Sequence, residues 1–319
     1  MNERNKKHVS YTPWRIGINR AAVPVINVLF YLCQALLVYS VYRGWLWLSV
    51  LLVLIVSHLM HGFLIGFHEA VHWGYRKNRV LNDFNGMLMG VISYNSFTLY
   101  RMLHQSHHVH FATKRDVELW PFNDPEAPLW KRRLVAFIEL NLGMVFTPFL
   151  FWRAFFCKGT EIRSPKIRRR IWVELALIVV FWSVAFTLIA HYDLWPWFFW
   201  NYLIPAYITG NMQSWRKYIE HVGLSGNTPR SGTRSIVTDT WVGKLISLSL
   251  LHEPFHGVHH IKGKMPYAEM PEHAEWLAAE EKGDTRPYAS YHAAIADLIR
   301  QLPDPKVGSQ WKTVEKSGA

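Results

Sequence analysis

The stretch HEAVH, residues 68–72, directly follows an apolar run that begins at residue 45. His68 and His72 are four residues apart, so on a helix both imidazoles lie on one face. Two further groups, HQSHH at 104–108 and HGVHH at 256–260, place histidines at i, i+3 and i+4, and a lone histidine follows in YIEHVG at 218–223. Because an imidazole beside an apolar segment is costly unless it is occupied, these groups predict metal binding. The candidate ligands are His68, His72, His104, His107, His108, His221, His256, His259 and His260.

The composition indicates a membrane protein. Half of the 319 residues are hydrophobic and 16 are Trp, which is a high content for a soluble protein. The net charge of +12 would suit a nucleic-acid-binding protein, but Lys and Arg cluster beside apolar runs, as in the flanks of membrane spans. We therefore expect no nucleic-acid partner. The two cysteines, Cys33 and Cys157, provide neither a disulfide framework nor a cysteine metal site.

Apolar length predicts the membrane spans. A helix needs about 20 apolar residues to cross the hydrocarbon core. A segment that is apolar but interrupted by Thr147-Pro148, residues 134–156, is expected to be re-entrant or interfacial. The segments long enough to cross, which form two hairpins, are 21–42, 45–67, 171–190 and 194–213.

Charge placement predicts the orientation of these spans. The N-terminal segment and the loops 74–133 and 158–170 are rich in Lys and Arg, whereas the links within the hairpins are nearly free of them. The positive-inside rule then places both termini and all four histidine groups in the cytoplasm.

The fold that follows is an all-α integral membrane protein. It has four transmembrane helices in two hairpins, re-entrant or interfacial helices, and a cytoplasmic helical cap that carries the histidines. A single domain is expected over 1–302, followed by a polar, disordered tail at 303–319.

The number of histidines argues for two metal ions. Nine ligands are too many for one tetrahedral zinc and suit two ions with five or six ligands each. Nitrogen ligands favour Fe, Zn, Cu or Ni without choosing among them. His252, which forms HEPFH with His256, is a reserve ligand or supporting group. The carboxylates that are candidates for orienting an imidazole are Glu69, Asp116, Glu118, Glu220 and Asp239.

Two other classes of protein must be weighed. HEAVH alone is typical of a zinc metalloprotease, with Glu69 as general base, but that role leaves six histidines without a purpose. A metal-binding or transport protein without catalysis would place histidines midway through several spans, whereas here they lie at the predicted cytoplasmic ends.

The combination HxxxH, HxxHH and HxxHH, separated by apolar hairpins, resembles the membrane fatty acid desaturase and hydroxylase superfamily. The segment 259–271 is similar to the tail that follows the family's third histidine box, and Asp116-Val-Glu118 resembles the acidic pair after its second. YIEHVGL at 218–224 is similar to a segment of bacterial alkane hydroxylases whose histidine is a ligand, although Lys217 and Val222 depart from it. The resemblance covers roughly residues 20–280.

This resemblance implies an O2-dependent oxidoreductase with two non-haem Fe ions and O2 as co-substrate. The di-iron centre itself would be catalytic, with no separate protein base, and would act on an unactivated C–H bond of a fatty acyl or similar lipid. We expect a fatty acid desaturase; the alternatives are a hydroxylase or monooxygenase of the alkane, fatty acid or carotenoid ketolase type and, remotely, the zinc protease.

A source of electrons must lie outside the chain. The sequence contains neither a cysteine pair for an iron–sulfur centre nor a glycine-rich dinucleotide fingerprint. We expect a separate carrier of the ferredoxin, rubredoxin or cytochrome b5-like type on the cytoplasmic face, where basic residues attract an acidic protein. The predicted location is a bacterial inner membrane.

Overall fold

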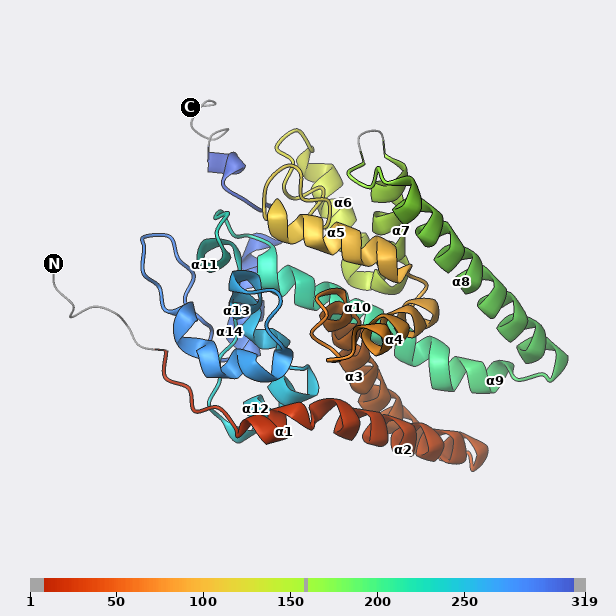
Figure 1. Ribbon diagram of the computed structural model, residues 1–319. Coiled ribbons are helices and arrows are strands. Elements are labelled where there is room, and N and C mark those ends of the chain that lie inside the picture. The colour runs from red at the N-terminus through yellow and green to blue at the C-terminus, as the bar shows by residue number, and fades with distance from the viewer. Residues whose placement is uncertain (1–8, 158–159, 313–319) are drawn as a thin grey trace. The chain divides into compact units, whose positions relative to one another are not determined.

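The structure is a computed structural model that describes residues 9–157 and 160–312. The elements of these residues are helices, with one isolated parallel bridge between Ile236 and Tyr288 (Figure 1). The chain divides into two compact units. We call residues 21–102 and 142–213 the membrane unit, and the described part of 1–20 with 103–141 and 214–312 the histidine unit.

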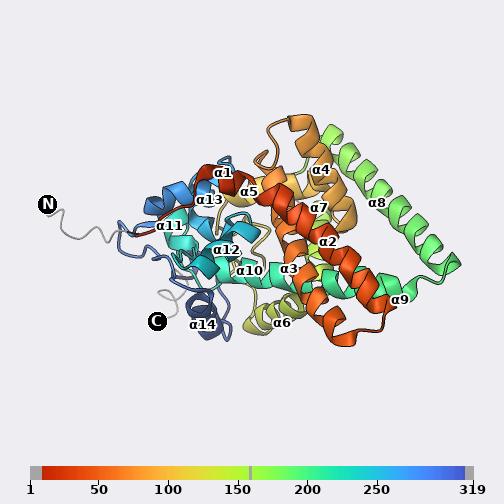
Figure 2. The same ribbon diagram turned by 90° about the horizontal axis from the view of Figure 1, so that it is seen from below.

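A helical hairpin opens the membrane unit. Helices α2 (Ala22–Tyr42) and α3 (Leu46–Val71) lie side by side, joined by a turn in which Gly44 has a φ of 68° (Figures 1 and 2). Leu37 of α2 packs against Leu52 and Val56 of α3. Most of α2 and the first half of α3 also carry exposed apolar side chains, such as Leu32 and Leu54, as expected of helices that contact lipid.

Three helices of the described residues are long and apolar enough to cross a membrane: α2, α3 and α8 (Pro165–His191). They coincide with the predicted spans 21–42, 45–67 and 171–190. The predicted fourth span, 194–213, is not among them. Its residues are divided between α9 (Trp195–Phe198), a π-helical turn η2 (Phe199–Leu203) and α10 (Ile204–His221), whose second half is polar.

The predicted break at Thr147-Pro148 was wrong. Helix α6 (Leu129–Asn141) ends before Leu142, and α7 (Gly143–Phe156) continues through Pro148. The backbone N–H of Gly143 donates to the side chain of Asn211 at 2.9 Å, so the new helix begins there. At 14 residues α7 is about 21 Å long, too short to cross a hydrocarbon core alone.

A buried carboxylate fixes the start of the helix that carries HQSHH. Helix α4 (Arg79–Ile92) is followed by α5 (Phe97–Val109). Glu174 of α8 accepts hydrogen bonds from the hydroxyl of Ser96 at 2.6 Å, and from the backbone N–H and hydroxyl of Thr98 at 2.8 and 2.6 Å. Arg170 donates to the same carboxylate at 3.1 Å. The beginning of α5 is therefore held by charge-assisted bonds.

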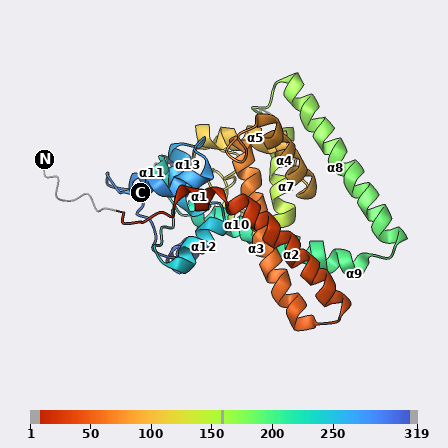
Figure 3. The ribbon, with the colours of Figure 1, turned by 60° about the horizontal axis from the view of Figure 1, so that its bottom comes forward.

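The histidine unit consists of short helices and loops (Figure 3). Arg234 is fully buried and donates to the carbonyls of Ile219 and Val222 and to Asp297, so it holds the end of α10. Besides α6, the end of α5 and the end of α10, the unit contains α1 (Ile16–Arg20), α11 (Pro229–Gly232), α12 (Trp241–Ser249), η3 (Glu253–Phe255), α13 (His256–Ile261), η4 (Tyr267–Leu277) and α14 (Tyr291–Gln301).

The expected disordered tail is packed over its first ten residues, so that prediction was wrong for 303–312. Val307 is fully buried, and its backbone N–H donates to the carbonyl of Phe122 at 2.9 Å. The indole of Trp311 donates to the same carbonyl at 2.8 Å. Two apolar anchors in a polar segment provide enough burial to order it. Residues 313–319 lie outside the described part of the chain.

We expect Glu174→Ala to destabilise the membrane unit. The substitution leaves the buried donors of Ser96 and Thr98 without an acceptor, which costs about 2–3 kcal/mol of unfolding free energy. Thermal unfolding in detergent checks this, with the exposed Glu161→Ala as a matched control. An unfolding midpoint equal to that of the control would contradict the role of Glu174.

Candidate metal centre

Seven of the predicted ligands lie within the histidine unit. Helix α5 brings His104, His107 and His108 to one face, and α13 does the same for His256, His259 and His260. His221 is the last residue of α10. All of these side chains are buried except those of His108 and His260, which are half-buried. They form two clusters.

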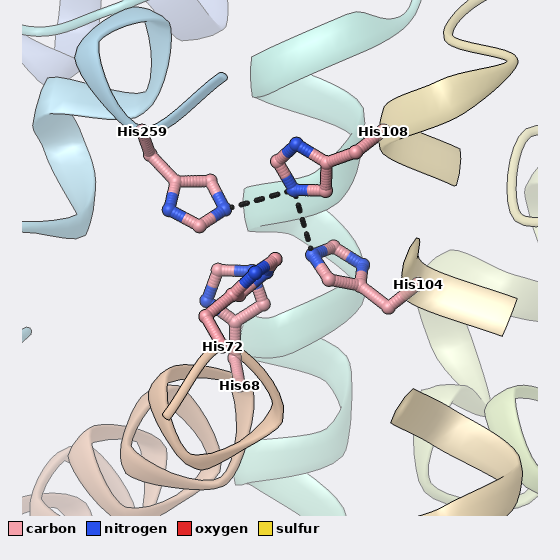
Figure 4. Close-up of side chains that lie close together, drawn as sticks. All are labelled: His68, His72, His104, His108 and His259. Carbon is pink, nitrogen blue, oxygen red and sulfur yellow. Dashed lines mark hydrogen bonds between the residues drawn. The ribbon is translucent and has the colours of Figure 1, made fainter. Parts of the chain in front are cut away.

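The first cluster contains His104, His108 and His259. The Nε2 atom of His108 lies 3.2 Å from Nε2 of His104 and 3.0 Å from Nε2 of His259. Figure 4 shows the three rings with these nitrogens turned toward one another, and it also draws His68 and His72. Three nitrogen donors from two helices thus converge on one point.

The second cluster contains His107, His221, His256 and His260. The Nε2 atom of His256 lies 2.9 Å from Nε2 of His221 and 3.1 Å from Nε2 of His260. The ring of His107 is centred 5.2 Å from that of His221 and 5.0 Å from that of His260. His221 therefore belongs to a cluster and is not an isolated core histidine.

Acceptors on the opposite ring nitrogen orient these imidazoles. Nδ1 of His107 lies 2.8 Å from Asp116, and Nδ1 of His104 lies 3.1 Å from both oxygens of Glu118. The acidic pair predicted after the second box thus contacts two imidazoles of that box. An acceptor at Nδ1 keeps the proton there and leaves the Nε2 lone pair free for a metal.

In the second cluster, Nδ1 of His256 lies 3.0 Å from Glu253 and 3.6 Å from Glu220. Nδ1 of His221 lies 3.3 Å from the carbonyl of Gly232. The arrangement of the first cluster therefore recurs. In His256 and His221 an oxygen atom lies next to Nδ1, the outer nitrogen, and Nε2, the inner nitrogen, faces the other histidines.

These donor sets fit metal ions. Ring nitrogens that face each other at 2.9–3.2 Å need either a proton or a cation between them, and an imidazole whose proton is held at Nδ1 leaves only the cation. With metal–nitrogen bonds of about 2.1 Å, neighbouring ligands at a right angle are about 3.0 Å apart, and tetrahedral ligands about 3.4 Å apart. The observed spacing is close to these values, so the nitrogens of each cluster could share one cation.

The electrostatics favour neutral imidazoles at the centre of the second cluster. Burial, followed by the neighbouring histidines, holds the pKa of His221 and of His260 well below the usual value. Burial is the largest influence on His107 and lowers its pKa, but the charge of Asp116, its hydrogen bond to the imidazole and the charge of Glu118 together outweigh burial and raise that pKa. The carboxylate of Asp116 would stabilise a cation bound at Nε2 of His107.

Two contacts around the second cluster were missed from the sequence. Arg216 donates to Glu220 at 2.7 Å and to Glu253 at 2.6 Å, so one guanidinium bridges both carboxyl groups beside His256. Burial still raises the pKa of Glu220 to about 8, although Arg216 opposes this. The contact of Glu253 with His256 could have been predicted from the sequence, because Glu253 lies three residues before His256 in HEPFH.

The first histidine group lies in the membrane unit, at the end of α3. His68 is in the last turn and His72 directly follows it. Their rings are centred 5.2 Å apart, and both side chains are buried. Glu69 approaches Nδ1 of His68 to 4.0 Å, beyond hydrogen-bond distance. The pair is therefore on one face of the helix, as the spacing predicted.

Two predicted supporting residues are elsewhere. Asp239 forms an ion pair with Lys244 at 2.7 Å and accepts from the backbone of Thr12, because it lies in the exposed loop before α12. His252 has a left-handed backbone with φ of 58°, and its Nδ1 contacts the hydroxyl of Ser247 at 3.0 Å. Asp239 therefore supports no imidazole of the two clusters in the described structure, so that prediction was wrong, whereas the role of His252 stays a prediction.

We expect Asp116→Asn to weaken metal binding about 10- to 100-fold, as loss of a carboxylate that orients a histidine ligand does. The amide cannot fix the proton on Nδ1 of His107 as the carboxylate does. Competition with a chelator measures the affinity, and the exposed Asp239→Asn is the matched control. Equal affinities of the two variants would show that Asp116 does not support a ligand.

Comparison with known proteins agrees with this arrangement. The family model described as fatty acid desaturase matches residues 45–292, a range that contains all nine predicted ligands. No curated protein matches the chain. The matched range covers most of the sequence and includes the apolar helices as well as the histidine groups. The chain belongs to the fatty acid desaturase family.

Proposed function

We propose that the protein is an O2-dependent di-iron oxidoreductase that desaturates a fatty acyl or similar lipid chain in a membrane. The observation that carries this proposal is the pair of histidine clusters, in which carboxylates lie on the outer nitrogens and the inner nitrogens converge. Membership of the fatty acid desaturase family supports the reaction class.

We propose that the nine histidines hold two iron ions. His107, His221, His256 and His260 would hold one ion. The first cluster offers only three nitrogens, and we propose that His68 and His72 complete it, since both side chains lie on one face of α3. Bound iron would supply the reduction of O2 and the removal of hydrogen from the lipid.

The side chains around the clusters have defined tasks in this proposal. Asp116, Glu118 and Glu253 orient imidazoles and balance the positive charge of the metal. Arg216 prevents the buried Glu220 and Glu253 from repelling each other. Burial of the imidazoles excludes bulk water, which protects the reaction from side products.

Desaturation is favoured over hydroxylation by the segment 259–271, which resembles the tail of the desaturases. A membrane hydroxylase or monooxygenase is the second candidate, and the observation in its favour is the place of His221 in the second cluster, as the resemblance of YIEHVGL to alkane hydroxylases implies. The two reactions require the same donor set and differ in whether a second hydrogen is removed or oxygen is transferred.

We further propose a multi-pass protein of a bacterial inner membrane, with both termini in the cytoplasm and 194–213 as a fourth span. The basic loops 74–133 and 158–170 support this orientation. Electrons would come from a separate ferredoxin, rubredoxin or cytochrome b5-like carrier.

Lipid profiling of a host that expresses the chain tests the proposed reaction. We expect a lipid whose mass falls by two hydrogens, and we expect the His107→Ala variant to lose this product together with bound iron. His107 is buried in the second cluster, so its removal deletes a ligand.

The matched control is His292→Ala, an exposed histidine in α14 that should leave both product and iron unchanged. A product heavier by one oxygen would show that the protein is a hydroxylase and would overturn the proposed desaturation. Full activity and an unchanged iron content in His107→Ala would show that His107 is not an iron ligand and would contradict the proposed role of the second cluster.

A further inference from the structure

A basic hollow lies on the surface of the histidine unit, beside the segment 303–312, which we call the C-terminal strap. Its volume is about 360 Å³. Arg300, Lys306 and Lys312 line it, and Asp304 is its single acidic residue. Asp304 is already paired with Arg132 at 2.5 Å and with Lys306 at 2.8 Å. The hollow therefore presents an excess of positive charge.

The strap is attached firmly to the unit. The backbone N–H of Gly223 donates to the carbonyl of Lys306 at 2.7 Å, and that of Gly308 donates to the carbonyl of Leu224 at 2.8 Å. Arg133, an exposed cation, donates to the carbonyl of Pro303 at 2.7 Å. The positive groups are thus presented by a fixed backbone, as a docking surface requires.

An aromatic side chain forms part of the hollow. Trp311 lines it and is held between two cations, with Arg132 at 4.5 Å and Lys306 at 5.1 Å from its ring. Its indole N–H donates to the carbonyl of Phe122 at 2.8 Å. Trp311 is 7% exposed, so its side chain is almost entirely buried where it lines the hollow.

From Trp311 a line of buried groups leads to the histidines. The ring of Phe122 is centred 5.3 Å from that of Tyr218, edge to face, and both side chains are fully buried. Tyr218 is one helical turn before His221 on α10. Its hydroxyl donates to Glu139 at 3.0 Å.

A polar branch links the same place to the first cluster. Lys217 contacts Glu139 and donates to the carbonyl of Glu118 at 3.3 Å. The carboxylate of Glu118 in turn contacts His104. The first cluster is therefore connected to Trp311 through packed or hydrogen-bonded groups, and the second is reached along α10, on which Tyr218 precedes His221 by one helical turn.

We propose that this hollow docks an acidic one-electron carrier and that Trp311, Phe122 and Tyr218 form the route by which its electrons reach the histidine clusters. The inference rests on the proposed function, because that function requires an external donor. Each docked carrier is oxidised by one electron. Two deliveries and two protons from solvent join the two hydrogens removed from the lipid to reduce one O2 to two waters.

Charge complementarity is the argument for this occupant. Complexes of redox proteins are small and weak, and their association depends on opposite charges more than on apolar area. An anionic lipid surface would also be attracted by Lys and Arg. A lipid surface, however, has no need of an aromatic group in the lining of the basic hollow that continues into buried aromatic groups, whereas an electron carrier does.

Binding of a reduced, acidic [2Fe–2S] ferredoxin to the metal-loaded protein in detergent tests the docking surface. We expect the double variant Arg300→Glu with Lys312→Glu to weaken binding about tenfold or more. The matched control, Lys264→Glu with Lys282→Glu, reverses two exposed charges that do not line the hollow and should bind as the wild type does. Added salt should weaken wild-type binding.

Equal ferredoxin affinity of the two double variants would overturn the docking surface. The docking surface would also be overturned if the Arg300 and Lys312 variant kept its affinity for ferredoxin and lost affinity for vesicles that contain phosphatidylglycerol. The basic patch would then bind lipid. Neither measurement counts lipid product. If the Arg300 and Lys312 variant loses ferredoxin binding although the wild-type chain binds ferredoxin and forms no oxidised lipid, the docking surface stands and the proposed reaction alone is refuted.

Stopped-flow oxidation of the reduced ferredoxin tests the route. We expect Trp311→Leu to slow the oxidation while the dissociation constant stays at the wild-type value, and Trp311→Phe, which retains a ring, to slow it less. Retained binding shows that the strap is still folded. Wild-type oxidation rates in both variants would overturn the aromatic route.

Discussion

The hydrogen bonds between the outer nitrogens of the histidines and buried carboxylates are the interactions on which the centre depends. Asp116, Glu118 and Glu253 each lie within 3.1 Å of an Nδ1 atom. These carboxylates hold the imidazole protons on Nδ1, so that the Nε2 atoms converge as neutral donors. Without these acceptors the imidazoles could rotate or change tautomer, and the spacing that suits a metal would be lost.

Burying carboxylates is costly, and the fold offsets that cost with cations. Arg216 contacts both Glu220 and Glu253, and Lys217 contacts Glu139. In the membrane unit, Glu174 is neutralised by Arg170 and satisfied by the loop that begins α5. Helices α5 and α10, which carry four of the predicted ligands, are thus positioned by polar networks whose other members are not histidines.

Periodicity and apolar length predicted the features that depend on local sequence. The faces of α3, α5 and α13 follow from histidine spacing, and three spans follow from apolar length. Features that depend on tertiary contacts were not predicted. Glu253 of η3 lies 3.0 Å from Nδ1 of His256, and Asp239 pairs with Lys244 instead of contacting an imidazole. The strap was missed because two anchors, Val307 and Trp311, are too few to give a periodic pattern.

The central claim is that the histidines form a site for two iron ions. It is tested most directly by the metal content of the purified full-length protein, measured for iron and zinc in the same sample. We expect two irons per chain and no stoichiometric zinc. One zinc and no iron per chain would contradict it and would favour the reading of HEAVH as a zinc protease motif.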